Sequence, residues 1–282
     1  MIALGPADPR YPRGLLDLRD PPDPLWVEGE VGILASRAIS IVGTRRMTPY
    51  GARVARELAA ACAGVGVVVV SGLAQGIDSA AHEAALDPGG ITVAVLGAGI
   101  AAYLDEARGR RRRLAHAIHA SGALVSEFPP PSPARSWMFA KRDTTIAALG
   151  ELAIVVEAPR DSGALITAAE ALRLGRPVYA VPGPIGALAS AGTNALIASG
   201  EARALTDASM LITTLELSTP MRGEEEPEDA ARVLDALAGS PSDPDALARR
   251  LGLSQTALAR IVARLMIRGR IGTAGDGRLA RR

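Results

Sequence analysis

Short apolar runs rich in β-branched residues alternate with helical patterns along most of this chain, and that alternation is the strongest constraint on its fold. Six runs have the composition of strands buried on both faces: Ile39–Gly43, Val67–Val70, Thr92–Gly97, Ala123–Ser126, Leu152–Glu157 and Val178–Val181. Helical patterns lie between them at Tyr50–Ala63, Ile77–Leu86, Arg108–Ala120, Thr144–Gly150 and Gly163–Leu174. Because parallel strands need crossover helices, we predict an α/β fold with a Rossmann-like, doubly wound, mostly parallel sheet.

The composition divides the chain into four segments. Residues 1–32 are rich in Pro and Asp and predict an N-terminal extended arm, followed by the Rossmann-like domain at residues 33–217. Residues 218–229 contain five acidic residues around Pro227 and predict a solvated acidic linker. Residues 230–282 predict a small C-terminal winged-helix domain, because a Gly-Asp-Gly turn between short arms follows three helical patterns, at Ala230–Leu237, Pro244–Leu251 and Gln255–Arg268.

Charge and cysteine content exclude several classes of protein and site. The chain has 282 residues and a net charge of +1, so a nucleic-acid site must be a local patch. Its one cysteine, Cys62, excludes an internal disulfide and a cysteine-rich zinc site. The first residues lack the pattern of a signal peptide, and no uncharged apolar stretch reaches the roughly 18 residues of a membrane helix. We therefore expect a cytoplasmic protein without membrane contact.

The residues that follow the predicted strands are the first candidates for a ligand site, because doubly wound sheets bind ligands at the carboxyl ends of their strands. Gly43-Thr44-Arg45-Arg46 follows the first strand, Ser71-Gly72 opens the loop after the second, and Gly97-Ala98-Gly99 follows the third. These glycines either make tight turns or let backbone N–H groups approach an anion, and the paired arginines favour phosphate. The chain has no Gly-x-Gly-x-x-Gly that opens a helix and no P-loop, so we predict no cofactor.

The segment that begins at Trp137 combines aromatic rings with cations. The chain has two Trp and two Phe, and Trp137 and Phe139 lie close to Lys141, which is the single lysine among 31 Lys and Arg residues. Rings that stack on bases beside cations that contact phosphates are typical of single-strand binding. Core packing of the rings is the alternative, and we expect one ring inside and the cations Lys141 and Arg142 outside. Both cations are expected just ahead of the helix at Thr144–Gly150.

Two further groups of residues have both a structural and a functional interpretation. Ser162, Gly163 and Thr167 either cap and shape the helix that begins there or contact a ligand. The run of arginines between Arg108 and Arg113 forms either a solvated helix face or an extension of a phosphate-binding surface.

An acid–base pair is the functional interpretation of Asp78 and His82, which are four residues apart and share a helix face. No nucleophile or metal-ligating cluster accompanies them, so a buried or capping role is favoured. We predict no metal site and no catalytic residue.

A series of motifs in a fixed order covers residues 11–215: Tyr11-Pro12, Asp20-Pro21-Pro22, Ile41-Val42-Gly43-Thr44-Arg45, Ser71-Gly72-Leu73-Ala74-x-Gly76-Ile77-Asp78, Ser126-Glu127-Phe128-Pro129, Ser162-Gly163-Ala164-Leu165-Ile166-Thr167-Ala168, Ala180-Val181-Pro182-Gly183 and Gly192-Thr193-Asn194-x-Leu196-Ile197. This series resembles the DNA-processing protein A family, also called DprA or Smf. The resemblance implies an extended Rossmann domain that binds single-stranded DNA as a homodimer. It further implies that the protein protects incoming DNA and helps to load the RecA recombinase in natural transformation and recombination, without catalysis.

The resemblance also assigns residues. Gly43, Thr44, Arg45 and Lys141 match positions that hold DNA phosphates in relatives. Relatives usually read Arg-Asn-Arg-Ile-Ile after the phenylalanine, where this chain has Arg142-Asp143-Thr144-Thr145-Ile146. Together with the strand-end loops, these matches predict a DNA-binding site made of Gly43, Thr44, Arg45, Arg46, Gly72, Phe139, Lys141, Arg142, Ser162, Gly163 and Thr167.

Partners and alternatives complete the sequence-based expectations. The homodimer is expected to cover the apolar segments Val178–Val181 and Leu196–Ile197, and residues 230–282 are expected to contact either duplex DNA or protein. A Rossmann-type nucleotide-processing enzyme resembling the phosphoribohydrolases is one alternative, but it would carry Pro-Gly-Gly-x-Gly-Thr where this chain has Pro182-Gly183-Pro184. A transcription regulator that binds through its winged helix is the other.

Overall fold

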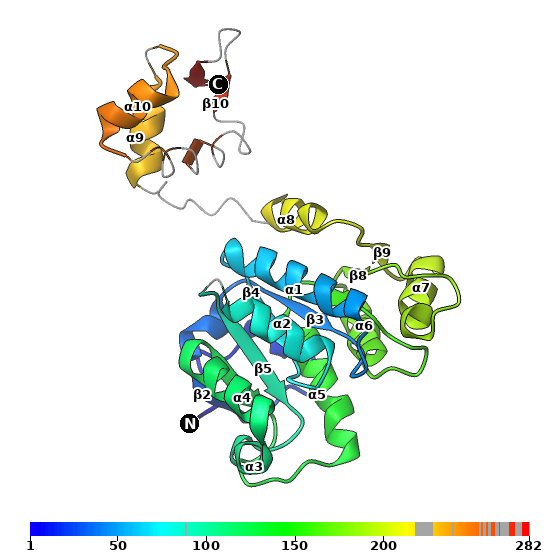
Figure 1. Cartoon of the computed structure of the whole chain (residues 1–282). Coiled ribbons are helices and arrows are strands. Elements are labelled where there is room, and N and C mark those ends of the chain that lie inside the picture. Colours follow the sequence, from blue (N-terminus) through cyan, green and yellow to red (C-terminus); the bar gives the residue numbers. More distant parts are fainter. Residues whose placement is uncertain are drawn as a thin grey trace. The chain divides into compact units, whose positions relative to one another are not determined.

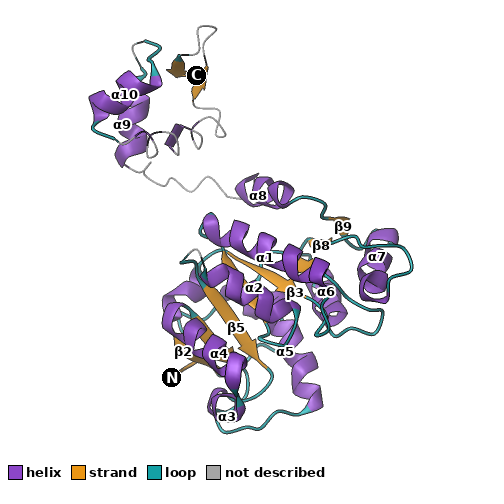
Figure 2. Cartoon of the chain, viewed as in Figure 1, coloured by secondary structure: helices purple, strands orange, loops and turns teal. Residues whose placement is uncertain are grey.

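The computed structural model describes residues 1–87, 89–217, 228–238 and 240–253, and beyond these residues 255, 258, 261, 262, 265, 271–273 and 278–281. The chain forms two compact units, Met1–Glu216 and Leu217–Arg282. Figures 1 and 2 show the elements of each unit.

A nine-stranded sheet organises the first unit, in the order β1-β2-β6-β5-β4-β3-β7-β8-β9. All strands from β6 to β9 in this order pair in parallel, and β1 and β2 add antiparallel pairs at one edge. The strand bounds are β1 Ile2–Leu4, β2 Leu25–Gly29, β3 Ala38–Val42, β4 Val68–Ser71, β5 Thr92–Leu96, β6 Ala123–Ser126, β7 Ala153–Val155, β8 Val178–Ala180 and β9 Arg203–Ala204. The predicted mostly parallel sheet is confirmed. Since the chain builds outward from β3 in both directions, the order reverses between β3 and β7, which makes this the place where doubly wound sheets bind ligands.

Helices cover both faces of this sheet. Their bounds are α1 Pro49–Gly64, α2 Ile77–Leu86, α3 Ile100–Glu106, α4 Gly109–Ser121, α5 Ser136–Leu149, α6 Ala164–Arg173, α7 Ala191–Ala198 and α8 Ala208–Leu217. Alternate strand residues separate the two layers: Ile39 and Ile41 pack with α1 and α2, whereas Val42 and Val70 pack with α5 and α6. In Figure 1 these two pairs of helices lie on opposite sides of the strands, as the crossover rule requires.

The N-terminal residues form more structure than an extended arm. Within residues 1–32, β1 and β2 join the sheet and the short 3-10 helix Arg13–Asp17 lies between them, while a second 3-10 helix, Val31–Ala35, begins at the end of this segment. Trp26 of β2 pairs with Ser126 of β6, so this segment covers a strand that would otherwise be an open sheet edge. Short strands flanked by prolines carry too little local signal to be predicted, and long-range pairing decides their structure.

The helix α5 begins eight residues earlier than the sequence pattern predicts, at Ser136 rather than Thr144. The expectation that Lys141 and Arg142 precede this helix is therefore wrong, because both lie within it. Helical spacing explains the difference: Met138, Arg142, Thr145 and Ile146 all face inward and are buried. A polar arginine and threonine in that stripe conceal the helical period in the sequence.

The apolar segments expected at a dimer interface are buried inside the first unit. Val178 and Tyr179 of β8 are almost fully buried, since β9 pairs with β8 and takes the edge position. Leu196 also packs into the core. The expectation that a second copy covers Val178–Val181 and Leu196–Ile197 is therefore corrected, because these segments pack within the first unit.

The second unit has its own apolar core. It contains α9 Glu228–Ala236, α10 Pro244–Leu251 and an antiparallel hairpin of β10 Ile271–Thr273 and β11 Leu279–Arg281. Val233, Leu247, Leu258 and Ile271 are among the residues that pack together. Much of the predicted helix Gln255–Arg268, most of the predicted linker at 218–229 and the Gly-Asp-Gly turn lie outside the described residues. Within the part that the structure describes, no helix is both long and apolar enough to cross a membrane.

Candidate nucleic-acid interface

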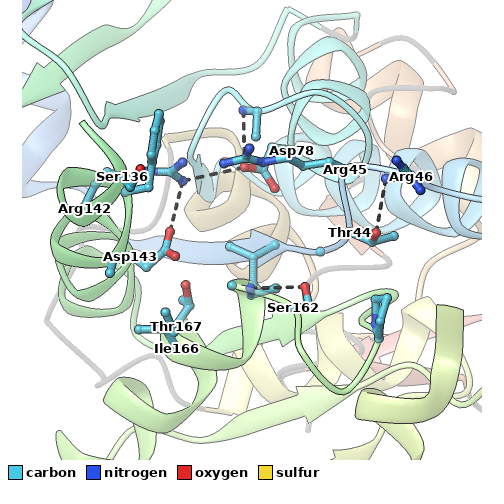
Figure 3. Close-up of a pocket in the computed structure, with 18 residues that line it drawn as sticks. Thr44, Arg45, Arg46, Asp78, Ser136, Arg142, Asp143, Ser162, Ile166 and Thr167 are labelled. Atoms are coloured by element: carbon cyan, nitrogen blue, oxygen red, sulfur yellow. Dashed lines mark hydrogen bonds and ion pairs between the residues drawn. The ribbon is translucent and has the colours of Figure 1, made fainter. Parts of the chain in front are cut away.

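A hollow of about 410 Å³ opens where β3 and β7 lie side by side at the carboxyl edge of the sheet. We call it the Arg45 pocket. Its wall combines the loop after β3, the start of α6, the first half of α5 and two residues that follow β4 (Figure 3). The lining residues are Val42, Gly43, Thr44, Arg45, Arg46, Ala74, Asp78, Ser136, Phe139, Ala140, Arg142, Asp143, Pro159, Ser162, Gly163, Ala164, Ile166 and Thr167. The pocket therefore lies at the reversal point of the strand order.

The loop after β3 is held from both sides. The backbone N–H of Thr44 donates to the carbonyl of Glu157 at 2.7 Å, and the backbone N–H of Arg46 donates to Thr44 Oγ1 at 3.1 Å. A Cβ on Gly43 would lie 2.6 Å from Ile77 Cγ1, so glycine is required by close packing. This rigid turn leaves the side chains of Arg45 and Arg46 exposed to solvent.

Arg45 and Phe139 form the chemically distinctive part of the wall. The Arg45 guanidinium carbon lies 5.3 Å from the centroid of the Phe139 ring, within cation–π range. The ring is partly buried, and a Cβ on Gly97 would lie 2.6 Å from it. Trp137 is 57% exposed and meets Phe128 edge to face at 5.5 Å. Phe139 is thus the more buried of the two rings, and it carries a cation on a surface that a base could share.

Arg142 lines the pocket but is buried rather than exposed. Its Nη1 lies 3.2 Å from Asp143 Oδ1 and 3.8 Å from Asp78 Oδ2, and all three side chains are almost excluded from solvent. Any side chain at Gly72 would collide with the Arg142 guanidinium. The expectation of an outward-facing Arg142 is wrong, because the charge of Arg142 is directed at two buried carboxylates.

The carboxylates around Arg142 have shifted pKa values. Burial raises the pKa of Asp78, while Arg142 acts in the opposite direction. Burial raises the pKa of Asp143 to about 6; Arg142 and Arg45 lower it, and Asp78 raises it further. Because one cation faces two acids, the inner wall of the pocket gains a net negative charge when both are ionised.

The predicted structural role of Asp78 and His82 is confirmed. Asp78 pairs with Arg142 in the interior. His82 is fully buried with Nδ1 2.7 Å from Thr92 Oγ1, and burial together with Arg142 lowers its pKa to about 3. A neutral, inaccessible imidazole cannot exchange protons with a ligand in the pocket.

Lys141 lies on the other side of α5 and does not line the Arg45 pocket. Its Nζ is 3.1 Å from Asp20 Oδ2 and 3.6 Å from Glu127 Oε2. Burial lowers the pKa of Lys141, but these two carboxylates outweigh it and the net pKa is raised. Glu127 is itself buried and accepts a hydrogen bond from Thr145. Lys141 thus ties the N-terminal segment to α5.

The start of α6 supplies the opposite wall. Ser162 Oγ accepts a hydrogen bond from the backbone N–H of Ala164 at 3.3 Å, so Ser162 shapes the turn before α6, while the N-cap position belongs to Gly163. Thr167 is fully buried, and its Oγ1 has no hydrogen-bond partner among the described residues. In Figure 3 this helix end lies opposite Asp143 and below Arg45. Helix N-termini attract anions.

The structure brings together most of the predicted site. Nine of its residues line the Arg45 pocket: Gly43, Thr44, Arg45, Arg46, Phe139, Arg142, Ser162, Gly163 and Thr167. Gly72 lines an adjoining hollow of about 230 Å³ that shares Arg45 and Phe139, and Lys141 lies outside both. Nine further lining residues were not in the predicted site, among them Asp78, Ser136, Asp143 and Ile166. Ile166 lies three residues after Gly163 and therefore on the same face of the helix, which is the sequence signal that could have identified it.

Asp143 gives the pocket an expected pH dependence. An ionised carboxylate in the wall repels a phosphate and a protonated one does not, so affinity for single-stranded DNA should rise as the pH falls through about 6. Two charges roughly 8 Å apart repel each other by about 2 kcal/mol at an effective dielectric constant of ~20. Salt screening reduces this repulsion, so the expected gain in affinity is about tenfold, or roughly 1.4 kcal/mol. Fluorescence anisotropy titrations on both sides of that pH measure it.

Asp143→Asn is the matched control for this titration. The amide oxygen still accepts from Arg142, but the charge is gone, so the variant should bind above the transition as tightly as the wild type binds below it. A variant that retains the wild-type pH profile would assign the transition to another group.

Metal binding finds no support among the described residues, where no group of three His, Cys, Asp or Glu could hold an ion.

Comparison with known proteins identifies relatives over nearly the whole chain. The family model described as DNA recombination-mediator protein A matches residues 3–216, and the model described as the DprA winged helix domain matches residues 217–277. The second match confirms the predicted C-terminal winged-helix domain.

Curated relatives share 31% to 46% of the aligned residues with this chain. Protein Smf of Escherichia coli is 43% identical over 198 residues, which are 70% of this chain and 52% of that protein. The putative DNA processing protein DprA of Mycobacterium tuberculosis (strain CDC 1551 / Oshkosh) is 46% identical over 178 residues, which are 62% of this chain and 45% of that protein. The chain spans about half the length of these relatives.

Solved structures agree in fold. DNA processing protein A from Streptococcus pneumoniae superposes with a TM-score of 0.70 at 34% identity, covering 75% of this chain and 73% of the other. DNA processing protein A from Helicobacter pylori, studied for its single-stranded DNA binding mode, superposes with a TM-score of 0.67 at 29% identity, covering 73% and 93%.

Proposed function

We propose, since this chain belongs to the DNA recombination-mediator protein A family, that it binds single-stranded DNA in the Arg45 pocket. The observation that carries the proposal is the pairing of exposed Arg45 with the Phe139 ring at the reversal point of the sheet. A cation beside an aromatic face offers a phosphate contact and a stacking surface in one place, which is the chemistry of single-strand binding. The H. pylori relative, whose single-stranded DNA binding mode has been studied, supports this assignment.

The cellular role follows from the family rather than from the pocket. We propose that the protein protects incoming single strands in the cytoplasm and helps to load the RecA recombinase onto them during natural transformation and recombination. The winged-helix unit contacts protein or duplex DNA in this proposal.

A homodimer is part of the same proposal, and an exposed apolar loop supports it. Ile185 is 101% exposed and Leu188 is 83% exposed, in the loop between β8 and α7. Neighbouring apolar side chains that stay in water favour burial against a second copy. Light scattering at micromolar concentration, with and without DNA, should give twice the chain mass, and Ile185→Ser with Leu188→Ser should shift it toward the monomer.

Several polar side chains that an enzyme could use in the pocket are buried or paired. Asp78 and Arg142 are paired with each other and buried, and Thr167 is fully buried. We propose that the protein binds without turnover. Incubation with labelled DNA, ATP, AMP and NAD distinguishes the alternatives, since turnover that Arg45→Ala abolishes would establish an enzyme.

Binding should survive removal of the winged-helix unit. The first unit carries the whole Arg45 pocket and separate apolar cores, so residues 1–217 should retain single-strand affinity within about twofold of the full chain, a difference of roughly 0.4 kcal/mol. Gel-shift titrations with single-stranded and duplex DNA measure this for both forms. If the shortened chain lost most of its single-strand affinity, the second unit would be needed for binding, and the transcription-regulator alternative would be favoured.

A further inference from the structure

Two further hollows adjoin the Arg45 pocket and lead to α4. One, of about 420 Å³, is lined by Arg45, Arg46 and Gln75 on one side and by Arg110 and Arg111 of α4 on the other. The other, of about 230 Å³, shares Arg45, Phe139 and Arg142 with the Arg45 pocket and reaches Tyr103, Glu106 and Arg111. Because Arg45 belongs to all three and Arg111 to two, the concave surface is continuous from the pocket to α4.

The charges on this path are not equivalent. Arg110 donates to both carboxylate oxygens of Glu83, at 2.6 Å for Nε, so its charge is largely compensated. Arg111 instead lies over the Tyr103 ring, with its guanidinium carbon 5.3 Å from the centroid. A ring orients the guanidinium without cancelling its charge. Glu106 is the one acid among the residues that line the path beside Arg111.

The position of these cations in α4 works against helix stability. Arg110, Arg111, Arg112 and Arg113 occupy the first turns of α4, where no acidic residue is present, and all four are exposed. Cations are favourable near helix C-termini and unfavourable near N-termini, so the dipole of α4 disfavours this placement. The arrangement concentrates positive potential at the end of the path, where a polyanion could use it.

We propose that the single strand held in the Arg45 pocket continues across Gln75 to α4, where Arg111 contacts a phosphate and forms the outer part of the site. The proposal rests on the proposed single-strand binding and adds a second tract to the site, which is the surface from Gln75 to Arg111. A short strand occupies the Arg45 pocket alone, and a longer one reaches Arg111.

Two oligothymidylates separate the tracts, one of about six nucleotides and one of about thirty, which bracket the usual site sizes of single-strand-binding folds. In the full-length protein, Arg111→Ala should weaken binding of the long strand. Its slope of log affinity against log salt should become shallower by roughly 0.7. The loss of affinity at 0.1 M salt should therefore be about fivefold, relative to the affinities at 1 M salt. Binding of the short strand should not change. Arg203→Ala removes another exposed cation, on β9 at the opposite edge of the parallel strands, and should leave both oligonucleotides at wild-type affinity.

Glu83→Gln provides the opposite test, because it frees Arg110 without removing a cation. The long strand should then bind about fivefold more tightly with a slope steeper by roughly 0.7, a gain that misfolding cannot produce. Wild-type binding of the long strand by both Arg111→Ala and Glu83→Gln overturns the second tract, as does an equal loss for both lengths. If Arg45→Ala still weakens the short strand, only the second tract fails. If the wild type binds neither strand, the proposed function fails as well.

Discussion

Replacing Arg142 with alanine is expected to destabilise the Rossmann-like unit by about 3–5 kcal/mol, the usual cost of removing one partner of a buried ion pair. Arg142 is 5% exposed and is the cation that faces Asp78 and Asp143. Without it, two acids share a buried space, and at neutral pH at least one must lose its charge or enter water. The Arg142 guanidinium also fills the space that a side chain at position 72 would need, which explains the glycine there.

Urea denaturation followed by tryptophan fluorescence measures this effect on one unit alone. Both tryptophans, Trp26 and Trp137, belong to the first unit, so unfolding of the winged-helix unit does not contribute. Arg45→Ala is the control and should change stability by no more than about 0.5 kcal/mol, since its side chain is exposed. A wild-type midpoint for Arg142→Ala would show that Arg142 does not compensate the buried acids.

Replacing Arg45 with alanine should have the reverse profile, with normal stability and a large loss of affinity. A hydrogen bond to a charged group contributes about 1.5–3 kcal/mol, so the expected loss is roughly 10- to 100-fold. The slope of log affinity against log salt should fall by roughly 0.7 for Arg45→Ala and by roughly 1.4 when Arg46 is also replaced. The loss should be similar for oligothymidylate and mixed sequences, because phosphates carry no sequence information.

Arg173→Ala is the matched control for Arg45→Ala. Arg173 is an exposed cation at the far end of α6 and pairs with Glu170. The Arg173→Ala variant should bind single-stranded DNA with wild-type affinity and wild-type salt slope. Equal affinity and salt slope in the Arg45 and Arg173 variants would exclude the pocket as the phosphate contact, even if the protein binds DNA elsewhere.

The sequence predicts the sheet and the pocket loops because both depend on local signals. Apolar runs such as Val67–Val70 are read directly as buried strands, and the carboxyl ends of adjacent strands must meet at one edge. This reasoning places Gly43 to Arg46 beside the start of α6, and the structure agrees.

The roles of Lys141 and Arg142 could not be predicted because their partners are distant in sequence. Lys141 contacts Asp20 from the N-terminal segment and Glu127 from the end of β6, and neither contact has a local signature. Arg142 pairs with Asp78 across two helices. An arginine can pair with a phosphate or with a buried carboxylate, so its residue type alone does not show which partner it has. The start of α5 at Ser136 sets the face of the helix on which Arg142 lies, and that face is buried.

The negative charge at Asp143 has a physical consequence that the sequence suggested only in part. The sequence places a negative charge next to the predicted site, and the structure places Asp143 in the pocket wall with its pKa raised to about 6. Burial supplies that shift, and burial cannot be read from the sequence.

Photocrosslinking is the most direct measurement of where a single strand binds. A thymidine-rich oligonucleotide that carries 5-iodouracil is irradiated with the full-length protein, and tryptic peptides are identified by mass spectrometry. Cleavage after Arg135 and Lys141 releases Ser136–Lys141, which contains both Trp137 and Phe139. We predict that this peptide carries the main adduct and that Arg45→Ala greatly reduces its yield. Adducts confined to residues 217–282, with this peptide unmodified, would contradict single-strand binding in the Arg45 pocket.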